Sequence, residues 1–267
     1  MSDGLKRGGL VAADAASWQA LEQWQSQQDA LVVETPVALV YNDVSHAVLM
    51  ATPIDLPDLA LGFSLSEGII SDPEQLFSVA EVPAEPDGIR LEMHIHGAQM
   101  QQLRQLHRYM AGPTGCGLCG KATLSAVQQQ LANLPPSAPP KAELMNAAVQ
   151  SLPRWQPIQQ QAGACHAAAW CDAAGQLQIV REDVGRHNAL DKLIGAARRL
   201  EVDLSSGFVV MSSRASYELV YKSVRAGIRT LVTVSGATSM AVNMAQARGL
   251  HLFGFARQDR LVRYTHH

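Results

Sequence analysis

The stretch Gly207-Phe208-Val209-Val210-Met211-Ser212-Ser213-Arg214 is an apolar run of strand length that ends in a short polar turn. A helical pattern follows it, and the same order of strand, turn and helix is repeated through the C-terminal half of the chain. The expected strands are residues 176–181, 207–211, 230–234 and 250–256, and the expected helices are residues 185–200, 217–226 and 239–248. This alternation predicts a sheet of mainly parallel strands covered by helices.

The N-terminal half has a different pattern. Strand-like runs occupy residues 31–42, 46–51 and 89–96, and helix-like runs occupy residues 58–68 and 99–109. The segment Pro135-Pro136-Ser137-Ala138-Pro139-Pro140 interrupts regular structure, so we place a domain boundary there. The predicted organisation is a loosely ordered segment 1–30 with a short helix through Trp18, Leu21 and Trp24, then a small α+β domain at 31–134 and an α/β domain at 141–267.

Length and composition indicate an ordinary globular protein. The 267 residues are 47% apolar and 17% charged, with a net charge of -3, which excludes a general affinity for nucleic acid or anionic membranes. We find no apolar run of the ~18 residues that a membrane span requires. Asp14 ends the apolar stretch after Arg7 too early for a secretory signal, and four cysteines do not make a disulfide scaffold. These features predict a cytoplasmic protein with reduced thiols.

Two cysteines lie in the glycine-rich segment Gly112-Pro113-Thr114-Gly115-Cys116-Gly117-Leu118-Cys119-Gly120. Leucines and other apolar residues then recur at helical spacing as far as Leu134, so the segment is expected to be an exposed loop that runs into a helix. A helix N-terminus and the nearby Lys121 would both stabilise a thiolate.

Three interpretations of this C-x-x-C spacing remain open. The cysteines could be small buried hydrophobes, half of a zinc site completed by Cys165, His166 or Cys171, or thiols for redox or sulfur-carrying chemistry. The glycines argue against burial, and no second C-x-x-C is present. The third interpretation is favoured, and no metal ligands are assigned.

The carboxyl ends of the expected parallel strands form the second candidate site. Two serine-rich turns follow Met211 and Val234 and open helices, with Arg214 in the first of them. The last strand runs into Phe255-Ala256-Arg257-Gln258-Asp259-Arg260, which adds an aromatic ring and two guanidinium groups. Backbone N–H groups and arginines bind phosphate, whereas ordinary N-capping explains the serines equally well. A phosphorylated, nucleotide-like ligand is the leading hypothesis.

The segment at residues 182–192 is unusually polar for a helix start. Asp183 is a suitable N-cap, and His187 and Asp191 lie on one helical face. A charged helix start explains part of this pattern. A functional role for Arg186 or His187 is as plausible as a purely structural one.

Six segments of the chain together resemble the FdhD family of formate dehydrogenase accessory sulfurtransferases. The matching segments are residues 60–70 (ALGFSLSEGII), 114–120 (TGCGLCG), 166–170 (HAAAW), 182–192 (EDVGRHNALDK), 212–218 (SSRASYE) and 264–266 (YTH). The ordered set covers the chain from about residue 31 to its end.

The resemblance implies a sulfurtransferase that takes sulfur from a cysteine desulfurase and delivers it to the bis-molybdopterin guanine dinucleotide cofactor of the formate dehydrogenase catalytic subunit. It implies that Cys116 carries the persulfide with Cys119 as its helper. Residues Phe255, Ala256, Arg257, Gln258, Asp259 and Arg260 would bind the cofactor, and GDP or another guanine nucleotide would mimic it.

The resemblance also implies a homodimer and a three-layer α/β second domain similar to the cytidine-deaminase fold. Deaminase chemistry is not expected, because Ala168 stands where a deaminase has its catalytic glutamate. The competing functions are a thiol–disulfide oxidoreductase and a zinc-stabilised chaperone of the dehydrogenase.

Overall fold

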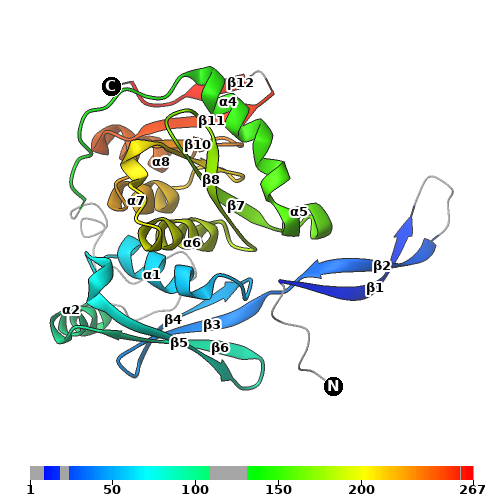
Figure 1. Cartoon of the computed structure of the whole chain (residues 1–267), viewed down its shortest axis with the longest axis vertical. Coiled ribbons are helices and arrows are strands. Elements are labelled where there is room, and N and C mark those ends of the chain that lie inside the picture. Colours follow the sequence, from blue (N-terminus) through cyan, green and yellow to red (C-terminus); the bar gives the residue numbers. More distant parts are fainter. Residues whose placement is uncertain (1–8, 19–23, 109–130, 259, 267) are drawn as a thin grey trace.

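The structure is a computed structural model that describes residues 9–18, 24–108, 131–258 and 260–266. It contains two main bodies joined through helices, and a hairpin that extends away from them (Figure 1). No helix in the described part of the chain combines the length and the apolar character needed to cross a membrane.

The first body is a four-stranded sheet with α1 on one face. The sheet has the order β4-β3-β6-β5, where β3 is Thr35–Tyr41, β4 is Val44–Ala51, β5 is Leu76–Ala84 and β6 is Gly88–Ile95. Helix α1 is Leu56–Ser66, and α2 is Gly97–Arg108. Alternate residues of β3, among them Val37, Leu39 and Tyr41, point into a core that α1 completes. The predicted helices and the strands predicted at 46–51 and 89–96 are confirmed. Residues 33–34 interrupt the strand predicted at 31–42, of which β3 is the longer part, and β5 was not predicted.

The second body is a six-stranded sheet between two layers of helices. The strand order is β12-β11-β10-β9-β7-β8. The strands are β7 (His166–Cys171), β8 (Leu177–Asp183), β9 (Phe208–Met211), β10 (Thr230–Thr233), β11 (His251–Arg257) and β12 (Arg260–Arg263). One face is covered by α6 (Arg186–Arg199), α7 (Tyr217–Arg225) and α8 (Ser239–Arg248), and the other by α4 (Ala142–Ser151). The predicted three-layer α/β architecture is confirmed.

The four predicted strands run in the predicted directions, and two strands, β7 and β12, were not predicted; β12 lies at the edge of the sheet, antiparallel to β11. Strands β8, β9, β10 and β11 run the same way, while β7 is antiparallel to both β8 and β9 and separates them. β7 was not predicted, because Ala167, Ala168 and Ala169 have low strand propensity and no alternation. The strand is apolar throughout because both faces of the sheet are covered there: Ala168 packs in the core on one face, and Ala167 and Ala169 pack in the core on the other.

The N-terminal segment differs from its prediction. Residues Leu10–Trp18 (β1) and Trp24–Val32 (β2) pair as antiparallel strands, from Leu10 opposite Val32 to Trp18 opposite Trp24. The predicted helix through Trp18 and Trp24 is therefore wrong, and the described part of the loosely ordered segment is a hairpin. Cross-strand pairing supplies the backbone partners that a helix would have made internally.

The end of the predicted helix after the cysteine loop also differs. Residues 131–134 have no regular secondary structure, and Leu131 packs in the core beside α6 and α7. The Leu134 N–H donates to the Arg248 carbonyl oxygen at 2.8 Å. We predicted residues 131–134 in the first domain, but Leu131 packs in the core of the six-stranded body. The other domain limits stay predictions. Residues 118–130 lie outside the described part of the chain.

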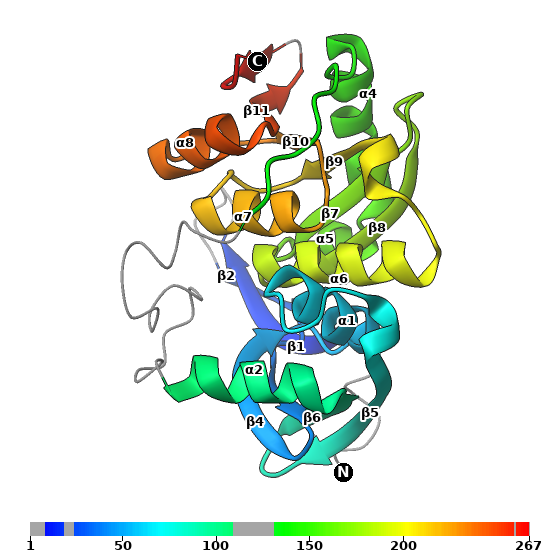
Figure 2. The ribbon, with the colours of Figure 1, turned by 90° about the vertical axis from the view of Figure 1, so that its left-hand side faces the viewer.

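The two bodies meet where α1 crosses α6, as Figures 1 and 2 both show. A Cβ atom at Gly62 of α1 would lie 1.7 Å from the Asp191 carbonyl oxygen of α6. On α6, a Cβ atom at Gly195 would lie 1.9 Å from the Asp58 carbonyl oxygen. Only glycine permits the two backbones to approach this closely.

We expect Gly62→Val or Gly195→Val to force the helices apart and to destabilise the protein by about 3 kcal/mol or more. The midpoint of urea unfolding measures this effect. Gly97→Ala is the matched control, because a Cβ atom there meets nothing within 4 Å, and it should leave the midpoint nearly unchanged. Equal midpoints for Gly195→Val and the control would show that the contact is not tight.

Candidate functional site

The candidate site lies along one edge of the six-stranded sheet, where β8, β9, β10 and β11 end and β7 begins. Hydrogen bonds join the turns that leave these strands into one surface. The Ser212 N–H donates to the Ala167 carbonyl oxygen at 3.0 Å, the Ser235 N–H to Ser213 at 3.3 Å and the Phe255 N–H to Ser235 at 3.1 Å. Groups that are far apart in sequence, from Asp183 to Arg257, therefore meet at this edge.

Two guanidinium groups occupy the part of the edge near β8 and β9. Arg186 begins α6 directly after β8, and Arg214 follows β9 in an exposed turn. Burial lowers the pKa of Arg186, and the neighbouring Arg214 cation lowers it further, while Glu218 acts in the opposite sense. The Arg186 Nε atom is buried and has no hydrogen-bond partner in the described part of the chain. An anion between the two guanidinium groups would relieve their repulsion and supply the missing acceptor.

The two histidines of this region are neutral at physiological pH. Burial, and then the Arg186 cation, lower the pKa of His166 from its usual 6.5. Burial lowers the pKa of His187 to about 3, and Arg186 and Lys222 add to the effect. The His187 Nε2 atom lies 3.2 Å from a Glu218 carboxylate oxygen and 3.4 Å from the Ser216 hydroxyl. Both imidazoles can donate or accept a hydrogen bond here without adding a charge.

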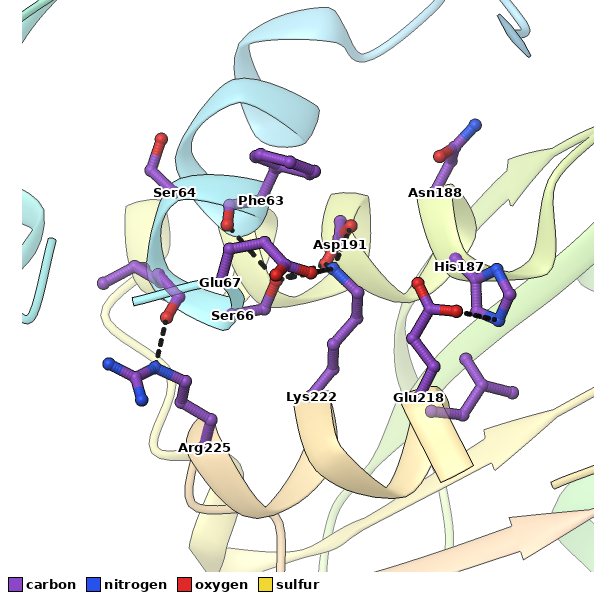
Figure 3. A network of polar contacts seen from close by, with 12 residues as sticks. Phe63, Ser64, Ser66, Glu67, His187, Asn188, Asp191, Glu218, Lys222 and Arg225 are labelled. Atoms are coloured by element: carbon purple, nitrogen blue, oxygen red, sulfur yellow. Dashed lines mark hydrogen bonds and ion pairs between the residues drawn. The ribbon is translucent and has the colours of Figure 1, made fainter. Parts of the chain in front are cut away.

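A buried ionic network lies beneath the start of α6 (Figure 3). The Lys222 Nζ atom is 2.9 Å from an Asp191 carboxylate oxygen, 2.7 Å from Glu67 and 3.0 Å from the Ser66 hydroxyl. Burial alone would lower the pKa of Lys222, but Asp191 and Glu67 raise it above its usual value. The ammonium group also lies 5.0 Å from the centre of the Phe63 ring. Because all these partners are satisfied, the network has a structural role and fixes α1, α6 and α7 together.

The predicted cofactor-binding segment lies at the β11 end of the same edge. Phe255 has a left-handed backbone with φ of 50°, and its ring packs against Gly236, where a Cβ atom would come within 2.9 Å. The Arg260 guanidinium carbon lies 4.4 Å from the centre of that ring. Arg257 pairs with Arg260 across the turn between β11 and β12, and its side chain is exposed at the end of β11. Asp259 lies outside the described residues.

The structure brings some of the predicted residues together and leaves others outside its described part. Arg186, His187, His166 and Arg214 meet at one end of the edge, and Phe255, Arg257 and Arg260 lie at the other. Cys116 and Cys119 belong to residues 109–130, which are not described.

The zinc interpretation paired these cysteines with Cys165, His166 or Cys171. Cys165 and Cys171 are free thiols at opposite ends of β7, so they do not lie side by side. Burial raises the pKa of Cys165 to about 11 and that of Cys171 to about 12. Within the described ranges, His, Cys, Asp and Glu side chains form no group of three that could hold a metal ion.

A cavity of about 390 Å³ opens at the start of β7, beside Arg186. Its walls include Gln156, Gln159, Cys165, His166 and Ser212. Sequence reasoning missed both glutamines, which lie in and before the short helix α5 (Pro157–Ala162). Their segment is rich in glutamine and has no motif, so only the folded chain shows that they face this edge.

The fold and the site define a class: an α/β protein with a cationic, hydroxyl-rich edge suited to an anionic ligand. The model of the FdhD/NarQ family matches residues 32–267, and the chain belongs to this family. A protein of Variovorax paradoxus named sulfur carrier protein FdhD is 47% identical over 98% of this chain and 94% of its own length. The protein of that name from Bordetella petrii is 44% identical over 97% of this chain and 89% of its own length.

A solved structure shows the same fold. The crystal structure from Desulfotalea psychrophila, described as a formate dehydrogenase accessory protein, matches with a TM-score of 0.75. The match covers 96% of this chain and 97% of the other, at 21% sequence identity. The predicted family and the mixed α/β fold class are confirmed.

The low pKa of His187 predicts a pH dependence of stability. In the unfolded chain the imidazole takes up a proton near pH 6.5, whereas in the folded chain its pKa is about 3. Between these values the unfolded state binds more protons than the folded state. The contribution of His187 to the free energy of unfolding is therefore fully present above pH 6.5 and is lost as the pH falls toward 3. The loss is at most about 1.4 kcal/mol per pH unit.

Thermal unfolding at pH 7 and pH 4.5 measures this contribution. The wild type should lose more stability between the two values than His187→Gln, which has no proton to bind there. His94→Gln, an exposed histidine on β6, should behave like the wild type. Parallel pH profiles for the wild type and His187→Gln would mean that His187 is protonated equally in both states.

Proposed function

We propose that this protein is a sulfur carrier in the maturation of formate dehydrogenase. It accepts sulfur from a cysteine desulfurase as a persulfide on Cys116 and transfers it to the bis-molybdopterin guanine dinucleotide cofactor. The names of its relatives support the sulfur-carrying role. The observation that carries the proposal for the substrate is the pair Arg186 and Arg214, two close cations with a buried, unpartnered Nε atom at a strand-end edge.

The edge suits a long ligand that carries several phosphates. Strand ends are spaced by about 4.8 Å, so the β11 and β7 ends lie roughly 14 Å apart, three steps along the sheet. Phe255 offers an aromatic surface for a base, with Arg257 and Arg260 beside it for phosphate oxygens. A guanine nucleotide such as GDP is the expected mimic of this end of the cofactor.

The first step of sulfur transfer is thiol exchange on sulfur. The Cys116 thiolate attacks the terminal sulfur of the desulfurase persulfide, a new S–S bond forms as the old one breaks, and the desulfurase cysteine leaves as a thiolate. Cys116 then carries one extra sulfur atom.

The second step releases this sulfur to the cofactor as sulfide, which requires two electrons. If Cys119 attacks the Cys116 sulfur, hydrosulfide leaves and a Cys116–Cys119 disulfide remains. A cellular dithiol must reduce that disulfide before the next cycle. In this scheme the two cysteines supply the electrons, and the oxidation state of molybdenum is unchanged. We expect the protein to be a homodimer. We expect this homodimer to bind the catalytic subunit of formate dehydrogenase.

Cys116→Ala should leave the fold intact and abolish sulfur delivery. The intact mass of the wild type, measured after treatment with a desulfurase and cysteine, should increase by one sulfur atom, whereas the variant should show no increase. Cys119→Ala should still accept sulfur and lose most of its delivery. Cys171→Ala, a buried thiol in the core, is the control and should accept sulfur normally. If the Cys116→Ala variant restored formate dehydrogenase activity, the assignment of Cys116 as the sulfur-carrying residue would be refuted.

Arg257→Ala with Arg260→Ala should weaken GDP binding at the β11 end. Each charge-assisted bond to phosphate contributes about 1.5–3 kcal/mol, so each lost arginine should reduce affinity about ten- to a hundredfold. Calorimetric titration measures the change. Arg90→Ala is the control, because Arg90 is exposed on β6, where it pairs with Glu92. If GDP affinity is the same in the double variant, its phosphates bind elsewhere.

A further inference from the structure

The four-stranded sheet of the first body is covered on one face. Helix α1 packs there, between the sheet and α6 (Figure 1), and Met100 and Leu103 of α2 belong to the same core. No helix in the described part of the chain packs against the opposite face, which we call the outer face.

The register of the sheet determines which residues form the outer face. Val37, Leu39 and Tyr41 of β3 are buried in the core, so the residues between them point to the outer face. Pairing across the sheet places one residue of each strand side by side, in the order β4, β3, β6 and β5. Two adjacent rows result: Val48, Ala38, Arg90 and Val82 form the first, and Ser45, Val40, Glu92 and Ala80 form the second.

The outer face is unusually apolar along β3 and β4. Pro36, Ala38 and Val40 are the outward residues of β3, and none of them is polar. On β4, the side chains of Val48 and Met50 are exposed, at 62% and 49%. A sheet face in water usually has polar side chains, whereas apolar residues on both faces are typical of a strand that is covered on both sides. Contiguous exposed apolar surface of this kind marks an interaction site.

The charges of the outer face are balanced. Arg90 and Glu92 are the charged members of the two rows, and they pair with each other at 3.0 Å. Their side chains are still 48% and 38% exposed, so both can form further ion pairs. The two rows have no net charge and therefore do not favour a strongly acidic or strongly basic partner. They match a surface with the same two charges in the opposite order, and a second copy of the chain supplies that surface.

We propose that the outer face is the surface through which two copies of this chain form a homodimer. A two-fold axis that crosses the strands between the two rows places Arg90 of each copy opposite Glu92 of the other, and Ala38 opposite Val40. Sheets pack face to face in this way at about 10 Å, with apolar side chains between them. The inference rests on the homodimer of the proposed function and assigns its interface.

The size of the outer face limits the strength of this dimer. Four strands spaced by about 4.8 Å, with eight residues of about 3.4 Å each, give a face of roughly 500 Å². Two copies would bury roughly 1,000 Å² in total, which is near the lower limit for a specific interface. We therefore expect a dimer that dissociates on dilution and that unfavourable charges on this face disrupt.

Sedimentation velocity of the full chain over a range of concentrations tests the interface. The wild type should form a dimer, and Val48→Lys/Met50→Lys should raise its dissociation constant at least tenfold, because four added cations would meet in the contact. Both side chains are exposed in the single chain, so the variant should fold, and thermal unfolding checks this. Trp155→Lys/Leu200→Lys is the matched control, since it adds the same charge at exposed apolar positions of the second body and should leave the dimer unchanged.

A charge exchange tests the two-fold arrangement. Arg90→Glu alone and Glu92→Arg alone should each raise the dissociation constant at least tenfold, because like charges then face each other at both contacts. An equimolar mixture of the two variants should form a heterodimer with nearly the affinity of the wild type, since both contacts regain opposite charges. Native mass spectrometry, with a tag on one variant, distinguishes the heterodimer. Mixing cannot repair a defect within one chain, so recovery would show a contact between copies.

A wild type that stays monomeric at every concentration would overturn the interface. A dimer that Val48→Lys/Met50→Lys leaves intact would also overturn it and would place the contact elsewhere, while failure of the mixture to associate would refute the two-fold arrangement. Sulfur loading of Cys116 is measured separately by intact mass, so the carrier role would stand in each case. If instead Cys116→Ala still delivers sulfur while Val48→Lys/Met50→Lys is monomeric, the carrier role fails and the interface remains.

Discussion

The backbone contact between α1 and α6 is the constraint on which the arrangement of the two bodies depends. Gly62 and Gly195 remove the side chains that would hold the helices apart. The same crossing buries Asp191, whose carboxylate accepts hydrogen bonds from Ser66 of the first body and Lys222 of the second. An uncompensated buried carboxylate is strongly destabilising, so both partners must be in place at once. Steric fit and charge pairing therefore select one orientation.

This constraint extends to the functional edge through α6. Arg186 and His187 form the first turn of the helix, and Asp191 lies one turn further along the same element. The network that joins the two bodies thus also fixes the direction from which the Arg186 cation reaches the edge. Lys192 adds a second buried tie, since its ammonium group binds Asp183 at the end of β8 and the Thr52 carbonyl oxygen of the first body. The proposed anion site and the contact between the two bodies therefore share helix α6.

Sequence patterns predicted most of the second sheet because its strands and helices follow strong, simple periodicities. They failed at β7, where three alanines have no strand signal, and at the N-terminal hairpin, where two tryptophans suggested a helix. For the site, the arginines and histidines near residues 186 and 214 stood out because charged groups at strand ends are chemically conspicuous. Gln156 and Gln159 did not, because only the folded chain places these two glutamines on the wall of the cavity at the start of β7. Such properties arise from tertiary packing.

The stacking of Arg260 on Phe255 has a consequence for selectivity. The aromatic face is already occupied by the protein's own cation, so a planar molecule that stacks there must first displace the guanidinium. A free base could stack on the Phe255 ring, but the protein would lose its cation–π contact with Arg260. A free phosphate could bind the Arg260 cation, but it could not replace the guanidinium on the ring. In the proposed site, a nucleotide would compensate for both losses, because its base would replace the guanidinium and its phosphate would bind the released Arg260. If the proposed ligand binds there, it would do so by exchange with Arg260, and neither the base nor the phosphate alone would bind as well as the two together.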